Sequence, residues 1–254
     1  MDSVLAKQHY NGHLPFSNDP LETYIRGLRL QPLVSLSDGK RVAWEVLSRV
    51  NDIHPDELFK DLSPEIKLSF LLWQMEFLAK KPGRYWLNVP LDVISKRYYI
   101  EKFLFSEQHD NIAFELQDPK NLLNCSEKIK SEARENINRL INHGWSIILD
   151  DVTENMVNEL LLVKLRFTGV KLDRSEVRNN PQLGRLVQWT RRLGDFVLVE
   201  GIETDDNLKK AIKTRAELAQ GFLWPEIDIP VTVPHYVYQR AYCWYQEHIK
   251  ENII

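Results

Sequence analysis

The sequence has few cysteines, no run of basic residues and no long apolar segment. Its two cysteines, Cys125 and Cys243, are too few for a disulfide framework. A net charge of -3, without a Lys/Arg run, gives no general attraction to a nucleic acid polymer. No stretch approaches the roughly 18 apolar residues of a membrane span, and the first residues lack the pattern of a secretory signal. We therefore expect a soluble, cytoplasmic protein that binds neither nucleic acid polymers nor membranes.

Low-complexity tracts and short-period repeats are also absent, and the hydrophobic pattern never lapses long enough for a linker. A length of 254 residues suits one α/β barrel domain. Residues 1–24 are polar and carry Gly12, Pro15 and Pro20, which predicts an N-terminal extension before a barrel domain over residues 25–254. The small negative charge does not exclude an anionic substrate, because metal ions can reverse the local sign of a site.

The chain opens with a hairpin pattern around Ser37–Lys40 and then alternates between strand and helix patterns. We expect strands near 28–36, 41–49, 85–88, 112–115, 147–150, 170–172, 196–200 and 216–222. We expect helices near 64–78, 126–142, 154–162, 181–193, 205–214 and, as a closing helix, 235–250. Repeated βα units predict parallel strands with right-handed crossovers. The fold class is therefore α/β, a TIM-like (β/α)8 barrel in which the initial hairpin supplies one antiparallel strand.

Polar residues recur at or near the exits of these predicted strands. They are Glu45, Asn88, Glu115, Asp150, Asp151, Lys171, Glu200 and Gln220. In an α/β barrel the carboxyl ends of the strands meet at one face, where active sites lie. Oxygen donors in this number suit Mg²⁺ or Mn²⁺. Adjacent aspartates can serve two ions, as in two-metal phosphodiester hydrolysis, and a lysine can stabilise charge on the phosphoryl group.

Each of these residues also has an ordinary structural interpretation. Asp150-Asp151 could cap the next helix, and Asn88 could be a turn residue before Val89-Pro90. Glu45 could face solvent, Lys171 could form an exposed ion pair with Asp173, and Glu200-Gly201 could simply end a strand. A shared site explains all of the positions together, whereas the ordinary interpretations require several independent coincidences.

The motifs that carry these residues resemble the EAL domain family, the cyclic di-GMP phosphodiesterase module of bacterial signalling. The resemblance extends from about Leu28 to Pro225. Its motifs are, in the family's order, Leu30-Gln31-Pro32-Leu33-Val34, Glu45-Val46-Leu47 with Arg49, Leu87-Asn88-Val89, Phe114-Glu115-Leu116, Leu149-Asp150-Asp151, Val170-Lys171-Leu172-Asp173-Arg174, Val199-Glu200-Gly201-Ile202-Glu203 and Ala219-Gln220-Gly221-Phe222. Eight ordered matches are far more specific than one.

The resemblance implies a role for each matched position. It implies two Mg²⁺ or Mn²⁺ ions held by Glu45, Asn88, Glu115, Asp150 and Asp151. Lys171 and Glu200, with Asp151, would position or deprotonate the attacking water. Contacts to the dinucleotide would come from Gln31, Arg49, Glu203 and Gln220. The implied reaction is hydrolysis of cyclic di-GMP to linear pGpG.

The sequence departs from the family after the aspartate pair. EAL domains usually continue Phe-Gly-Thr-Gly, whereas this chain reads Val152-Thr153-Glu154-Asn155. Glycine permits positive φ without steric cost, so its loss should restrict the loop or let the helix start earlier. The usual Thr-Glu is Gln117-Asp118 here, and Pro90 replaces a usual serine. The sequence also shows no attached sensory or diguanylate-cyclase domain. Two other functions therefore stay open: a catalytically weak or silent regulator that binds a protein partner, and a receptor that binds cyclic di-GMP without cleaving it. A homodimer also stays open.

Overall fold

The computed structural model describes residues 20–51, 54–104 and 110–251. The described residues form two compact units: one contains Arg29–Leu47 and Gln74–Ile227, the other Ser48–Trp73 together with the residues up to Leu28 and from Asp228 onward. The strands are β1 (Ile25–Ser35), β2 (Arg41–Val50), β3 (Tyr85–Val89), β4 (Ile112–Leu116), β5 (Ser146–Val152), β6 (Phe167–Leu172), β7 (Gly194–Val199), β8 (Leu218–Gln220) and β9 (Ile227–Pro230). The helices are α1 (Pro20–Tyr24), α2 (Pro55–Lys60), α3 (Pro64–Ala79), α4 (Leu91–Ile94), α5 (Arg97–Leu104), α6 (Pro119–Asn124), α7 (Glu127–Asn142), η1 (Glu154–Met156), α8 (Val157–Leu162), α9 (Arg174–Asn179), α10 (Leu183–Thr190), α11 (Asp205–Thr214) and α12 (Tyr236–Glu251).

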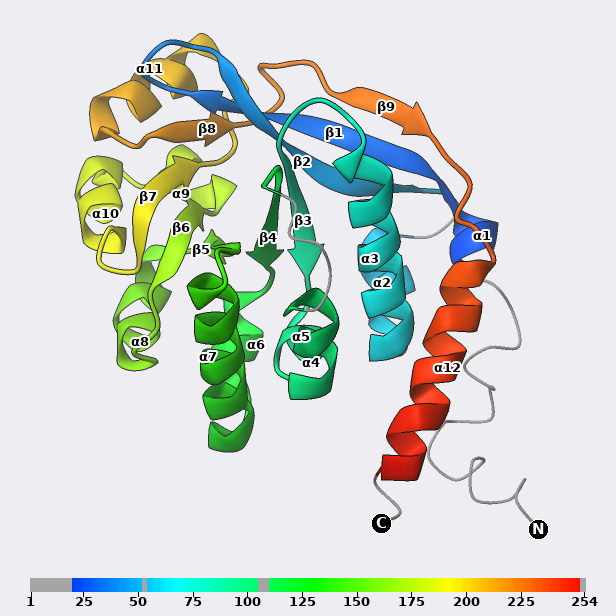
Figure 1. The fold of residues 1–254 in the computed structure, drawn as a ribbon. Coiled ribbons are helices and arrows are strands. Elements are labelled where there is room, and N and C mark those ends of the chain that lie inside the picture. The colour runs from blue at the N-terminus through cyan, green and yellow to red at the C-terminus, as the bar shows by residue number, and fades with distance from the viewer. Residues whose placement is uncertain (1–19, 52–53, 105–109, 252–254) are drawn as a thin grey trace. The chain divides into compact units, whose positions relative to one another are not determined.

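The strands β1 to β8 form a closed barrel (Figure 1). Strands β2 to β8 pair in chain order and in parallel. Strand β1 pairs with β2 on one side and runs antiparallel to β8 on the other, which closes the ring. Strand β9 pairs with β1 outside the ring. The predicted TIM-like barrel with one antiparallel strand is confirmed.

A layer of apolar side chains fills the interior of the barrel. The core cluster consists of Leu33, Ala43, Trp86, Ala113, Ile148 and Leu198, with Phe196 and Leu218 packed against it. Side chains alternate between the two faces of a strand, so the residue two positions further on faces the same interior. On the parallel strands that residue is Glu45, Asn88, Glu115, Asp150, Glu200 or Gln220. The polar residues therefore form the next layer, towards the carboxyl ends of the strands.

Strand β6 contributes no side chain to the apolar layer, because its residue at this level is Gly169. A Cβ added to Gly169 would lie 2.3 Å from the ring of Phe196 on β7. The Phe196 ring occupies this space and lies 5.8 Å, centroid to centroid, from Trp86. Two positions beyond Gly169 is Lys171, which belongs to the polar layer. Gly169 and the Phe196 ring on the neighbouring strand thus complete the apolar layer that lies next to the polar residues.

Helices α7 and α11 begin at side-chain caps, and helices α7 and α10 pack on strands of the barrel. Ser126 accepts a hydrogen bond from the Ile129 amide at the start of α7, and Thr204 forms a capping box with Asn207 at α11. Helix α7 contacts β5 and helix α10 contacts β7 (Figure 1). These helices cover the outward faces of strands that are buried on both sides.

Several elements differ from the sequence expectations. Helices α4 and α5 lie within residues 91–104, where the sequence pattern had predicted no helix. Pro90 lies before the first turn of α4, where its missing amide costs nothing. Strand β9 lies in the proline-punctuated stretch before α12, and an edge position tolerates its Pro230. Of the predicted extension 1–24, residues 1–19 lie outside the described part of the chain, while 20–24 form α1 with Leu21 fully buried.

The second unit is held together by polar contacts of α12. The Tyr238 hydroxyl accepts a hydrogen bond from the Leu21 amide at 2.5 Å. The hydroxyl of Ser69 donates to the Val237 carbonyl at 2.7 Å and accepts from the Arg240 guanidinium at 2.9 Å. These hydrogen bonds join α12 to α1 and to the first half of α3. The closing helix is therefore held by side-chain hydrogen bonds as well as by apolar packing.

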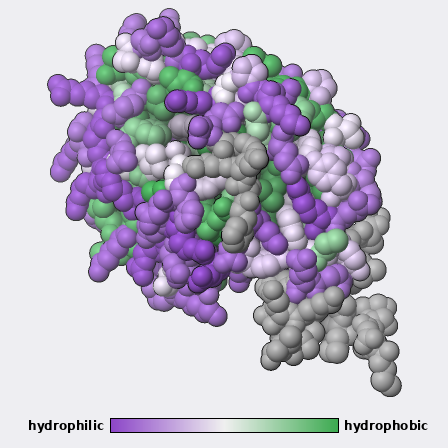
Figure 2. Space-filling view, viewed as in Figure 1, coloured by the Kyte–Doolittle hydropathy of each residue, from purple (hydrophilic) through white to green (hydrophobic). Residues whose placement is uncertain are grey.

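Hydrophilic side chains cover much of the visible surface, with hydrophobic residues in small separate areas (Figure 2). The most exposed large hydrophobic side chains are Leu162 at 78% and Phe222 at 65%. Among the residues that the structure describes, no helix combines the length and the apolar character needed to cross a membrane.

Candidate active site at the carboxyl end of the barrel strands

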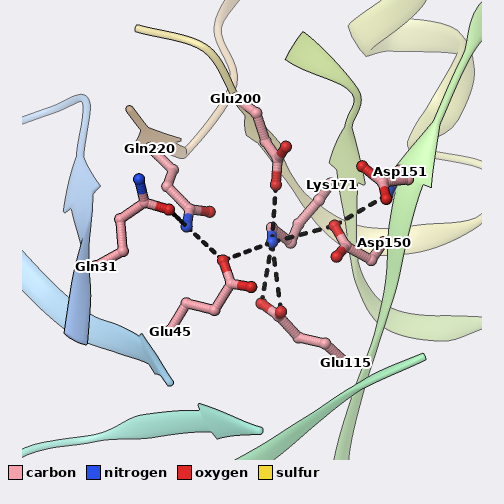
Figure 3. A network of polar contacts seen from close by, with 8 residues as sticks. All are labelled: Gln31, Glu45, Glu115, Asp150, Asp151, Lys171, Glu200 and Gln220. Carbon is pink, nitrogen blue, oxygen red and sulfur yellow. Dashed lines mark hydrogen bonds and ion pairs between the residues drawn. The ribbon is translucent and has the colours of Figure 1, made fainter. Parts of the chain in front are cut away.

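The Lys171 ammonium lies at the centre of a buried cluster of carboxylates (Figure 3). Its Nζ atom is 3.1 Å from Glu45 Oε2, 3.3 Å from Glu115 Oε1, 3.1 Å from Asp150 Oδ1 and 2.7 Å from Glu200 Oε1. These residues come from β2, β4, β5, β6 and the end of β7. The barrel therefore brings together at one mouth side chains that are far apart in the sequence.

Two glutamines extend this network on the side of β1 and β8. The Gln220 amide nitrogen donates hydrogen bonds to Gln31 Oε1 and to Glu45 Oε2 (Figure 3). Glu45 thus accepts from both an ammonium and an amide, which fixes the orientation of its carboxylate. The Oε1 atom of Gln220 is buried and has no hydrogen-bond partner among the described residues.

The pKa values of the carboxylates in the cluster are shifted in different directions. Burial raises the pKa of Glu115 and of Glu200 well above the usual value, and neighbouring carboxylates add to the rise. For Glu45, burial acts in the same direction but is outweighed by the Lys171 charge and the Gln220 hydrogen bond, so its pKa lies below the usual value. Burial alone would lower the pKa of Lys171, but Asp150 and the other carboxylates raise it well above its ordinary value. Lys171 therefore binds its proton more tightly than an exposed lysine does.

The aspartate pair lies within β5 and does not cap the following helix. Asp150 is 5% exposed and contacts Lys171, while Thr153 is the residue that precedes η1. Asp151 is exposed, and its amide donates to Asp150 Oδ1 at 2.9 Å. Desolvation, followed by the charge of Asp150, raises the pKa of Asp151 to about 6. The charge of Asp173 adds to that rise.

The other ordinary interpretations also fail. Glu45 is 6% exposed and does not face solvent, and Lys171 is 1% exposed. Asn88 lies inside β3, beside Glu115 in the sheet register, and not in a turn. Glu200 follows β7 directly and pairs with Lys171. Their polar side chains line the barrel interior.

The donor set fits hard divalent cations. Ligand oxygens of Glu45, Glu115 and Asp150 lie within 4.8 Å of one another, and so do those of Asp150, Asp151 and Glu200. The two groups share Asp150, as two neighbouring ions would require. The Oδ1 atom of Asn88 is buried and accepts no hydrogen bond from any described residue. All the donors are oxygens, which suits Mg²⁺ or Mn²⁺.

Two of the predicted substrate-binding residues lie outside this network. Arg49 belongs to the other unit and forms an ion pair with Asp228 at 3.5 Å. Glu203 accepts a hydrogen bond from Arg178 and is not linked to the Lys171 cluster by any contact between described residues. The network thus contains Gln31 and Gln220 of the predicted substrate contacts, and Asn88 lies beside it on β3.

A cavity of about 350 Å³ lies at the opposite end of the barrel. Its lining includes Val42, Arg84, Ile112 and Ser146, which stand at or near the starts of their strands. The lining contains a single carboxylate, Asp110, and none of the residues around Lys171. Its chemistry is not that of a cation site, so the carboxyl end remains the candidate active site.

The chain is a closed α/β barrel that gathers carboxylates and a lysine at the carboxyl ends of its strands, the face where active sites lie in barrel enzymes. The sequence profile of the EAL domain matches residues 25–226. The chain belongs to the EAL domain family.

Known relatives are similar to this chain at low identity. The cyclic di-GMP phosphodiesterase RocR of Pseudomonas aeruginosa is 24% identical over 221 residues, which cover 76% of this chain and 55% of RocR. The chain thus spans about half the length of that relative. Among solved structures, BlrP1 of Klebsiella pneumoniae in a calcium and cyclic di-GMP complex is 17% identical with a TM-score of 0.63, covering 84% of this chain and 61% of BlrP1. An EAL domain protein from Listeria monocytogenes is 17% identical with a TM-score of 0.63, covering 82% of this chain and 90% of that protein. These structures share the fold.

Proposed function

We propose that this protein is a metal-dependent phosphodiesterase that hydrolyses cyclic di-GMP to linear pGpG. The observation that carries the proposal is the pair of overlapping carboxylate groups around Lys171, joined through Asp150. The similarity to RocR, a cyclic di-GMP phosphodiesterase, supports the substrate. The solved complex of BlrP1 with cyclic di-GMP supports it as well.

The proposal assigns each residue of the cluster a role. Glu45, Asn88, Glu115 and Asp150 hold one divalent cation, and Asp151 with Asp150 serves a second. Two Mg²⁺ or Mn²⁺ ions, when bound, would stabilise the negative charge of the phosphodiester and lower the pKa of the attacking water. Gln31 and Gln220 bind the dinucleotide at the side of the mouth formed by β1 and β8.

Lys171 and Glu200 act on the reacting groups. Lys171 keeps its proton, because the surrounding carboxylates raise its pKa, and so it stabilises negative charge on the phosphoryl oxygens. Glu200 lies 2.7 Å from Lys171 and has a raised pKa, which makes it a stronger proton acceptor than an ordinary carboxylate and suits it to accept a proton from water. Arg49 and Glu203 are further candidates for substrate contact through the guanidinium and carboxylate that they offer.

A product assay tests the proposal. Purified protein is incubated with cyclic di-GMP and Mg²⁺ or Mn²⁺, and pGpG is separated by chromatography. We expect product, and we expect Glu45→Ala to lower the rate by about 10²–10³-fold, as loss of one preorganised charged group does. Glu127→Gln, at an exposed glutamate on α7, is the control and should keep the rate. Absence of pGpG from the unmodified protein would reject the enzyme.

Two observations favour an alternative, a regulator or receptor that binds without turnover. The segment after Asp151 lacks the family's glycines, and Arg49 is engaged by Asp228. Tight, metal-dependent binding of cyclic di-GMP without pGpG would establish the receptor. Metal-independent binding of a protein partner, again without pGpG, would establish the regulator.

A further inference from the structure

The backbone at Asp151 adopts a conformation that needs external support. Its φ is 52°, in the left-handed region, and the register of β5 against β6 shifts between Leu149 and Val152. Non-glycine residues visit this region rarely, and such conformations persist when surrounding contacts fix them. The following residues, Val152-Thr153-Glu154-Asn155, include no glycine that could absorb the turn.

Two backbone groups beyond Asp151 are fastened to the segment that follows β6. The carbonyl of Val152 accepts a hydrogen bond from the Asp173 amide at 3.0 Å. The amide of Glu154 donates to Glu176 Oε1 at 2.9 Å. On its other side Asp151 follows Asp150, which Lys171 holds in the barrel. The residues before and after Asp151 are therefore both held by contacts with β6 or with the segment that follows it.

Asn180 completes this attachment from the end of α9. Its side-chain nitrogen donates to Glu154 Oε2 at 2.9 Å and to Glu176 Oε2 at 2.7 Å. Its side-chain oxygen accepts from the Gln182 amide at 2.8 Å, and the residue is only 7% exposed. One amide group thus bridges two carboxylates that would otherwise repel each other. We call Glu154, Glu176 and Asn180 the α9 clamp.

We propose that the α9 clamp positions Asp151 for the second divalent cation, with Glu176 and Asn180 as positioning residues. This inference rests on the proposed function, in which Asp151 serves that cation. A carboxylate on a freely moving loop must be ordered when the ion binds, and that ordering weakens affinity. The clamp fixes the segment after Asp151 before the ion binds, so less ordering is needed on binding. Supporting groups of this kind change metal affinity by about 10–100-fold.

The test measures Mn²⁺ binding by titration calorimetry and amide hydrogen exchange at Glu154 by NMR. The unmodified protein should bind two ions. Glu176→Ala and Glu154→Ala should weaken the second ion by about 10-fold or more and leave the first unchanged. Glu176→Ala should also remove the protection of the Glu154 amide. Glu176→Gln retains an acceptor for that amide and should restore both the protection and the second ion.

Asn179→Ala is the matched control, because Asn179 is the exposed neighbour of Asn180 in α9 and should behave as the unmodified protein. Asn180→Ala would also remove the hydrogen bond to the Gln182 amide and could unfold the chain. Glu154 is exposed, so Glu154→Ala tests the clamp without this risk. Equal binding of both ions by Glu176→Ala and the unmodified protein would overturn the clamp. Failure of the unmodified protein to bind any Mn²⁺ would overturn the proposed function, while unchanged exchange at Glu154 in Glu176→Ala would overturn the clamp independently.

Discussion

Lys171 is the single cation at the centre of the described carboxylate cluster, and we expect the stability of the cluster to depend on it. It is 1% exposed and lies within 3.3 Å of oxygens from four carboxylates. Removal of one partner from a buried charge network leaves uncompensated charge, at a cost of about 3–5 kcal/mol. We expect Lys171→Met to lower the free energy of unfolding of the metal-free protein by this amount, measured by urea denaturation in a chelator.

The same variant should respond more strongly to divalent cations than the unmodified protein, because its carboxylates no longer have the Lys171 ammonium among them. Lys209→Met, at an exposed lysine paired with Asp206, is the control and should change stability by less than about 0.5 kcal/mol. A Lys171→Met protein as stable in chelator as the unmodified protein would contradict the central role of this ammonium.

Asp151 predicts a pH dependence of the metal-free protein. Its pKa is raised to about 6 in the fold, against roughly 3.9 in an unfolded chain. Between these values the folded state holds the proton more tightly, so this residue stabilises the fold at low pH and the contribution is lost as pH rises towards 6. In a chelator, the melting temperature of Asp151→Asn minus that of the unmodified protein should therefore rise from pH 4.5 to 7.5. A pH-independent difference would contradict the raised pKa.

The sequence could predict the residues of the Lys171 network but not their contacts. Strand periodicity predicted that Glu45, Glu115, Lys171 and Glu200 would reach one end of a barrel, and the structure brings them together. The ion pairs of Arg49 with Asp228 and of Glu203 with Arg178 could not be predicted, because a motif gives the order of residues and not the direction of a side chain. Their roles, like those of the whole site, stay predictions.

At the scale of strands, the fit between β6 and β7 depends on Gly169. A Cβ at that position would lie 2.3 Å from the Phe196 ring. We expect Gly169→Ala to lower the free energy of unfolding by about 1–3 kcal/mol through overpacking. Phe196→Leu in the same protein should recover part of this loss in a double-mutant cycle measured by denaturation.

Gly184→Ala in α10 is the matched control, since its added Cβ would meet its nearest neighbour at 3.8 Å. In a helix this change should be neutral or stabilising by up to about 1 kcal/mol. Equal changes in the free energy of unfolding at the two glycines would show that the Phe196 ring does not occupy the space beside Gly169.

Helices were predicted less completely than strands. The long helices α7 and α11 carry clear periodicity and caps, whereas α4, α6 and α9 span six residues or fewer and have too few turns for a pattern. Helix α9 matters most, because Glu176 and Asn180 reach Glu154 across 22 and 26 positions of the chain. No local signal marks such contacts.

For the whole molecule, the excess of carboxylates predicts that cations stabilise the barrel unit. Ligand present at 100 times its Kd adds about 2.7 kcal/mol to the unfolding free energy. For a unit of this size that is a rise of about 5–10 °C in Tm, measured by thermal unfolding with Mn²⁺ or with chelator. Glu115→Gln should reduce the rise, and Glu127→Gln should preserve it. A Tm that does not respond to Mn²⁺ would contradict the cation site.

The sequence by itself determined the barrel and the set of polar residues at its mouth. Alternating side chains and repeated βα units are local properties, and they fix which residues reach the same end of the strands. Only the tertiary structure decided that Lys171 contacts Glu45 across 126 positions, that Arg49 pairs with Asp228, and that the Glu154 amide bonds to Glu176 of α9. Contacts of this kind depend on packing in three dimensions, because barrel closure and loop attachment set distances that no local pattern contains.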